Sequence, residues 1–138
     1  MGRTLEKVKV QNFVDLFNAT QGDLDTSQVR TAEIEAVVDT GATYLCLPPT
    51  VIEQLGLLYA RTQTVTTANG PAERRFFKGA DITIKDRNIE MAVMENDEAT
   101  PPLIGYLILE ALDFVVDPKA NRLIPNPEHD GKWIADLL

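Results

Sequence analysis

A carboxylate stands directly after an apolar run in the stretch Val37-Val38-Asp39-Thr40-Gly41-Ala42-Thr43. The apolar run predicts a buried strand, so Asp39 would lie at a sheet end in partly apolar surroundings, where an isolated charge is costly. Gly41 lets the backbone turn sharply and brings its N–H close to that carboxylate. Thr40 adds a hydroxyl that can hydrogen-bond to a neighbouring chain. The pattern is typical either of an Asx-type turn at a strand end or of one half of an acid–base pair.

A second motif, Leu103-Ile104-Gly105, joins a short apolar strand to a segment with helical periodicity. The helix is expected at residues 106–112. Taken alone, Gly105 indicates close packing between this helix and a strand. The motif bears on chemistry only in combination with the Asp39 loop.

The two motifs together resemble the retroviral-type (retropepsin-like) aspartic proteases. Two apolar residues followed by Asp39-Thr40-Gly41-Ala42-Thr43 are similar to the catalytic loop of these enzymes. Leu103-Ile104-Gly105 matches the apolar-apolar-glycine motif that precedes their C-terminal helix, at the expected place in the order of elements. Thr67-Ala68-Asn69-Gly70 resembles the flap region of the bacterial and cyanobacterial members. The resemblance covers residues 29–124.

The resemblance implies a role for each matching residue. Asp39 would be catalytic. Three residues would support the catalytic loop, namely Thr40, Gly41 and Ala42. Four residues would form the flap and bind substrate, namely Thr67, Ala68, Asn69 and Gly70. The tip differs from the glycine-rich viral flaps because Gly70 is followed by Pro71, which makes it stiffer. Tyr106 stands where the viral enzymes have an arginine, so contacts between subunits are expected to differ in detail.

The implied mechanism needs a second carboxylate. Two Asp side chains held close together cannot both ionise and therefore share one proton. The sequence contains a single Asp-Thr-Gly and no Asp-Ser-Gly, so the second Asp39 must come from another copy of the chain. We therefore expect a homodimer that acts on a peptide or protein substrate. The alternative is a non-catalytic dimeric module of the same fold that binds a peptide or protein partner.

Short strands must position these motifs. Alternating or short apolar segments predict strands at residues 5–17 (with a bulge near Asn12-Phe13), 29–38, 62–67, 80–84, 88–94 and 103–104. Residues 114–124 are expected to form a final hairpin that turns at Pro118 to Asn121. Residues 18–28 are expected to be a loop between two strands of a hairpin, and Asn69-Gly70 a second hairpin turn. Helices are expected at residues 48–57, where Thr50 and Glu53 have capping-box spacing, and at 106–112. Such a pattern is typical of a small β-barrel or sandwich.

With the resemblance, this pattern predicts a mainly β fold, a small closed acid-protease-like barrel with one or two short helices and one lobe per chain. A chain of 138 residues fits one domain. We place the protease domain at residues 1–124 and a C-terminal tail at 125–138. The apolar residues of the tail are expected to pack on the chain's own core, with a dimer interface as the alternative; they are Trp133, Ile134, Leu137 and Leu138.

The composition excludes several classes of partner. The net charge of −8 argues against nucleic acid, whose phosphates attract basic surfaces. No apolar run approaches the length of a membrane helix, and the N-terminus lacks the apolar core of a secretory signal, so we expect a cytoplasmic protein without a membrane partner.

The remaining side chains predict no metal site and no cofactor, because no His, Cys or carboxylate cluster has ligand spacing. Cys46 is expected to pack as a small hydrophobe. His129 is expected to be a solvated loop residue, and Lys85-Asp86-Arg87 a charged turn.

Overall fold

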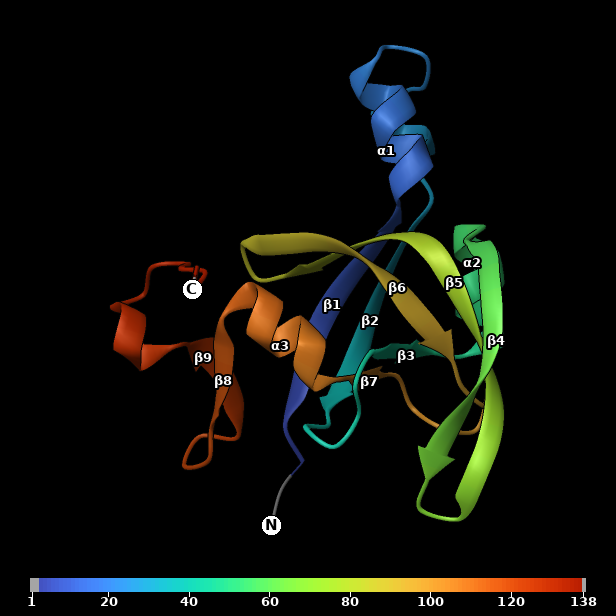
Figure 1. The fold of residues 1–138 in the computed structure, drawn as a ribbon. Coiled ribbons are helices and arrows are strands. Elements are labelled where there is room, and N and C mark those ends of the chain that lie inside the picture. The colour runs from blue at the N-terminus through green and yellow to red at the C-terminus, as the bar shows by residue number, and fades with distance from the viewer. Residues whose placement is uncertain (1–2, 138) are drawn as a thin grey trace.

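The computed structural model describes residues 3–137, which contain nine strands and three α-helices (Figure 1). The strands are β1 Leu5–Asn12, β2 Thr31–Val38, β3 Leu45–Leu47, β4 Leu58–Thr67, β5 Gly70–Ile84, β6 Arg87–Glu95, β7 Leu103–Ile104, β8 Phe114–Asp117 and β9 Arg122–Pro125. The helices are α1 Phe13–Thr20, α2 Pro49–Leu55 and α3 Tyr106–Leu112, with 3-10 turns η1 Thr26–Gln28 and η2 Pro127–His129. Met1 and Gly2 lie outside the described residues, and so does Leu138, the last residue of the predicted C-terminal tail.

The main sheet closes on itself through β5, which is long enough to pair with three strands. Seven strands follow the order β1-β2-β7-β3-β6-β5-β4, and β5 pairs with β1 as well. The second half of β5 makes this closing contact, from Lys9↔Thr83 to Asn12↔Ala80. Its first half pairs with β4 in a hairpin that extends past the barrel (Figure 1). The prediction of a mainly β, small barrel is therefore confirmed.

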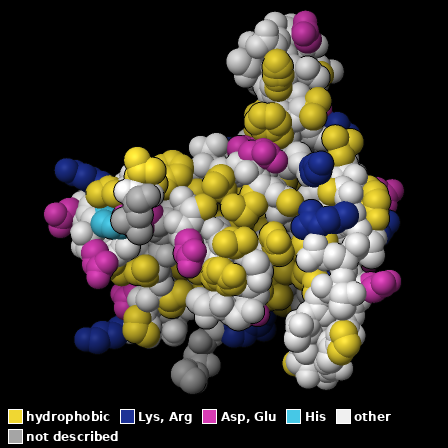
Figure 2. All heavy atoms as spheres, in the orientation of Figure 1, with side chains coloured by type: hydrophobic (Ala, Val, Ile, Leu, Met, Phe, Trp, Pro, Cys, Tyr) yellow, Lys and Arg dark blue, Asp and Glu magenta, His cyan; other side chains and the backbone are white. Residues whose placement is uncertain are grey.

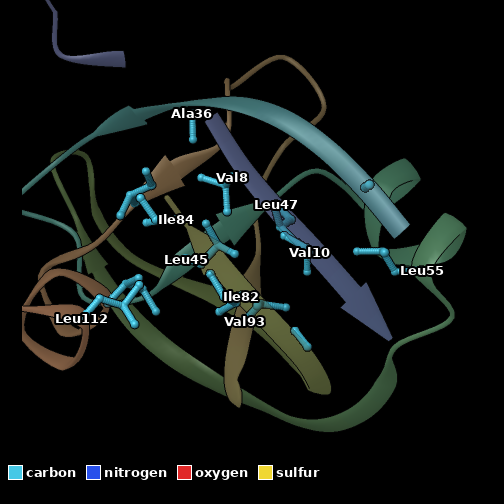
Figure 3. Close-up of a cluster of buried hydrophobic side chains, with 14 of the residues drawn as sticks. Val8, Val10, Ala36, Leu45, Leu47, Leu55, Ile82, Ile84, Val93 and Leu112 are labelled. Atoms are coloured by element: carbon cyan, nitrogen blue, oxygen red, sulfur yellow. The ribbon is translucent and has the colours of Figure 1, made fainter. Parts of the chain in front are cut away.

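Buried apolar side chains from most of these elements fill the barrel (Figure 3). The fully buried members include Val8, Val10, Ala36, Leu45, Leu47, Leu55, Ile82, Ile84, Val93 and Leu112. Their alternation along β1 and β5 explains why the strand pattern was recognisable in the sequence. None of the helices among residues 3–137 combines the length and the apolar composition needed to span a bilayer.

The strand predicted across residues 5–17 is wrong after Asn12, where the chain turns into α1. The Asn12 side chain accepts a hydrogen bond from the Asp15 backbone N–H at 2.9 Å and so caps the helix. The Asp15 carboxylate binds the Arg30 guanidinium through two hydrogen bonds of 2.8 and 3.0 Å, and Arg30 holds the pKa of Asp15 below its usual range. These contacts outweigh the local alternation. The pairing of β1 with β2 was predicted correctly, but α1 and η1 occupy part of the predicted loop.

Two further local predictions differ in detail. The α2 helix ends at Gly56 with φ of 62°, as its sequence indicates, but Thr50 caps nothing within it. The Thr50 N–H and hydroxyl bind the Glu98 carboxylate instead, at 2.7 and 3.1 Å. In the β4–β5 hairpin, Thr67 pairs with Gly70, so the turn residues are Ala68 and Asn69 rather than Asn69 and Gly70.

Arg87 is not the exposed turn residue that its charge predicts. Only 5% of it is exposed, and its Nη1 donates to the carbonyl oxygens of Leu112 and Asp113 at 2.8 and 3.1 Å. Its Nη2 donates to the Gly131 carbonyl at 3.0 Å. Arg87 therefore binds carbonyls at the C-terminal end of α3, where a cation is favoured.

His129 is also more constrained than predicted, because it binds the Asp113 carboxylate through Nδ1. Asp113 ends α3 and accepts further hydrogen bonds from the Asn126 side chain and the Ile134 N–H. Trp133 donates to the Ala111 carbonyl at 3.0 Å. The tail thus binds the end of α3, although Trp133, Ile134 and Leu137 remain exposed. The boundary at residue 125 stays a prediction.

The Asp113–His129 pair predicts a pH-dependent stability. Asp113 raises the pKa of His129 above 6.5, and His129 lowers the pKa of Asp113 below 3.8. The stabilisation is therefore complete between these two ordinary values. It is lost as pH rises through the raised pKa of His129 and as pH falls through the lowered pKa of Asp113.

We expect His129→Gln to lower the melting temperature most near pH 5, with a difference from the wild type that shrinks as the pH rises above about 7. Thermal unfolding followed by circular dichroism between pH 4 and pH 9 measures this. The sequence has a single histidine, so no other imidazole complicates the range. A difference that stays constant across the range would contradict the assignment.

Candidate active site

Asp39 follows β2 directly and is held by hydrogen bonds at both its backbone and its side chain. Its N–H donates to the Ile104 carbonyl at 3.0 Å, and its carbonyl accepts from the Ala42 N–H at 3.0 Å. Its carboxylate Oδ1 accepts from the Gly41 N–H at 2.9 Å. A Cβ at position 41 would lie 3.2 Å from this oxygen, so the absence of a side chain there keeps the turn tight. The carboxylate is thus oriented while it remains partly accessible.

The strand β7 lies between the two strands that flank this loop. Its Ile104 pairs with Val38 of β2 in parallel and with Leu45 of β3 in antiparallel orientation. The Asp39 loop and the Leu103-Ile104-Gly105 motif, far apart in the sequence, are therefore adjacent in space.

Gly105 allows the chain to pass from β7 into α3 against the backbone of the loop. A Cβ at this position would lie 2.4 Å from the Thr43 carbonyl carbon and 2.4 Å from the Tyr44 carbonyl oxygen. The first N–H groups of α3 then bind the loop, because Tyr106 donates to the Ala42 carbonyl at 2.8 Å and Leu107 to that of Thr43 at 3.1 Å. The end of the loop and the start of α3 therefore satisfy each other's backbone groups.

The loop opens into a cleft of about 900 Å³ between the barrel and the β4–β5 hairpin. The hairpin side is formed by Gln63 to Ala68 and Arg74, and the opposite side includes Met94, Asn96 and Leu103. A cleft of this volume is large enough for several residues of an extended peptide. Asp39 is the one carboxylate among the described residues that line it.

The predicted site residues divide between this cleft and its surroundings. Six of them line it, namely Asp39, Gly41, Ala42, Thr67, Ala68 and Leu103. Thr40 is exposed beside Asp39, and Ile104 is fully buried. Asn69 and Gly70 lie at the hairpin tip, where the Thr67 hydroxyl donates to the Gly70 carbonyl at 2.6 Å.

Sequence reasoning missed several residues of the cleft, including Tyr44, Gln63, Arg74 and Asn96. The side chains of Arg74 and Arg75 point to opposite faces of β5. Only the pairing of β5 with β4 reveals which of the two arginines faces the cleft. Cys46 also lines it, with 1% of its surface exposed. Burial, reinforced by the Asp39 charge, raises the pKa of the Cys46 thiol to about 12. Cys46 is therefore a protonated packing residue, as predicted, and not a nucleophile.

Comparison with known proteins agrees with this geometry. A family model described as "gag-polyprotein putative aspartyl protease" matches residues 26–111, well over half of the chain. A search of the curated proteins finds no match. The matched segment contains the Asp39 loop, the β4–β5 hairpin and β7 with Gly105. The chain therefore belongs to the retropepsin-type aspartyl protease family.

Proposed function

We propose that the protein is a homodimeric aspartic endopeptidase in which each chain contributes one Asp39. The observation that supports this most directly is an oriented, accessible carboxylate in a cleft that is large enough for a peptide. No second carboxylate lines the cleft within residues 3–137, so acid–base chemistry needs a partner chain. The family to which the chain belongs gives an aspartic protease-type function independently of this geometry.

In the proposed mechanism the two Asp39 carboxylates share one proton. The ionised carboxylate takes a proton from a water molecule as that water attacks the carbonyl carbon of the peptide bond. The protonated carboxyl gives its proton to the carbonyl oxygen, which forms a neutral tetrahedral diol. Collapse of the diol transfers a proton to the leaving nitrogen and breaks the C–N bond. The Gly41 N–H binds Oδ1 of Asp39, which would leave Oδ2 to interact with the water.

We assign the neighbouring residues by their positions. Thr40 is exposed next to Asp39 and would hydrogen-bond to the loop of the partner chain. Ala42, Thr67 and Ala68 would contact the substrate, since all three line the cleft. Asn69 and Gly70 would form the tip of a flap that closes over the bound peptide. Leu103, Ile104 and Gly105 act through the loop that they support.

The proposed mechanism predicts that activity depends on protein concentration. Peptide hydrolysis per chain should rise with concentration and level off over the range in which sedimentation detects conversion of monomer to dimer. An internally quenched peptide library at pH 5 supplies the substrate, because the shared proton must be present. Constant activity per chain at concentrations where the monomer dominates would rule out the shared site.

A further inference from the structure

We propose that Arg74 makes the enzyme select peptides with an acidic side chain near the bond that is cleaved. This inference rests on the proposed endopeptidase function and adds a substrate class to it. Arg74 would bind an Asp or Glu side chain of the substrate as a guanidinium–carboxylate pair.

Strand geometry places Arg74 and its neighbour Arg75 on opposite faces of β5. Arg74 shares a face with Phe76, whose ring packs edge-on against Tyr44 of the cleft with centroids 5.1 Å apart. The residue paired with Arg74 on β4 is Gln63, which also lines the cleft. Arg75 faces the other way, where it binds the Glu95 carboxylate at 2.8 and 2.7 Å.

The charge of Arg74 is not neutralised by a carboxylate within the described residues. The cations that form ion pairs in residues 3–137 are Arg30, Arg75, Lys85 and His129. Arg74 is partly buried, and its Nη1 donates to the carbonyl oxygen of Glu73 at 3.0 Å. Four acidic residues, Glu73, Glu95, Asp97 and Glu98, share a second pocket with Arg74, but none of their carboxylates lies within ion-pair distance of its guanidinium. The guanidinium therefore keeps donors available for a ligand.

The charges that line the cleft favour an acidic ligand. Asp39 and Arg74 are the charged side chains of its lining within residues 3–137. In the proposed dimer the two Asp39 residues share a proton and carry one negative charge, whereas the two Arg74 residues carry two positive charges. The cleft would be net positive in a chain whose net charge is −8. It would attract a carboxylate locally, although the rest of the surface repels anions.

Hydrolysis of matched peptides tests the proposal. Octapeptide libraries in which each position in turn is Glu, Gln or Lys are compared by kcat/KM. For the wild type we expect Glu to exceed Gln about tenfold at one or two positions, as for a partly desolvated ion pair. Arg74→Gln should bring this ratio close to one, and Arg74→Glu should favour Lys. The matched control Arg75→Gln removes the same charge from the opposite face and should keep the preference for Glu.

Binding separates failure of this inference from failure of the proposed function. Fluorescein-labelled Glu and Gln octapeptides are titrated into the Asp39→Asn variant, with and without Arg74→Gln, and followed by anisotropy. If the wild type cleaves peptides but neither hydrolysis nor binding distinguishes Glu from Gln, the inference is overturned and the function stands. If the wild type cleaves no peptide, and Arg74-dependent binding of the Glu peptide persists, the proposed function fails but the binding site for an acidic side chain stands. A preference that survives Arg74→Gln, or the absence of any binding, overturns the inference.

Discussion

Replacing Asp39 by Asn is expected to lower kcat for peptide hydrolysis by about 10³-fold or more, because an amide can neither accept the proton of the attacking water nor share a proton with its partner. The change is nearly isosteric. The Asn oxygen can still accept the hydrogen bond that Gly41 N–H now donates to Oδ1 of Asp39 at 2.9 Å. Folding and dimerisation should therefore be preserved, so the loss would report chemistry alone.

Mixing the two proteins gives a sharper test of the shared site. If chains exchange freely, an equimolar mixture contains about a quarter wild-type dimers, and the activity of a fixed amount of wild type should fall to about half. Sedimentation and circular dichroism of Asp39→Asn provide the control for assembly and fold. Full activity in the variant, or wild-type activity unaffected by the added variant in spite of mixed dimers, would contradict the proposed mechanism.

The geometry of the Asp39 turn was predictable because its determinants are local. Asp39 and Gly41 are two residues apart, so their hydrogen bond follows from the turn itself. The contact between this loop and Gly105 was not predicted, because the resemblance gave only the order of the two motifs along the chain. No periodicity in either segment indicates that β7 inserts between β2 and β3, because strand order depends on contacts between distant parts of the chain.

The wrong predictions share the same physical origin. Residues 13–17 resemble a strand when only alternation is considered, but Asn12 and Arg30 stabilise a helix there. Arg87 and His129 are polar residues beside turns, and each finds its partners at the end of α3, far along the sequence. A polar side chain in a turn is usually solvated, so the buried partner decides its role and the local sequence does not reveal it.

Gly105 provides the second large expected effect, on stability. Gly105→Ala should lower the free energy of unfolding by about 3 kcal/mol or more, at the upper end of what overpacking costs. The added Cβ would lie 2.4 Å from backbone atoms of Thr43 and Tyr44, and backbone cannot yield as the end of a flexible side chain can. Relief would require α3 to move away from the loop, which breaks the hydrogen bonds that Tyr106 and Leu107 donate to it.

Urea unfolding at a fixed protein concentration measures this loss, which should appear as a lower midpoint with an unchanged m-value. Gly79→Ala is the control that separates a steric clash from backbone strain. Gly79 has φ of 90° and no atom within 4 Å of an added Cβ, so only the conformational penalty of about 1–2 kcal/mol should apply. Gly105 has φ of −84°, which alanine adopts without strain. A smaller loss for Gly105→Ala than for Gly79→Ala would therefore mean that the loop and α3 are not packed as closely as the active-site geometry requires.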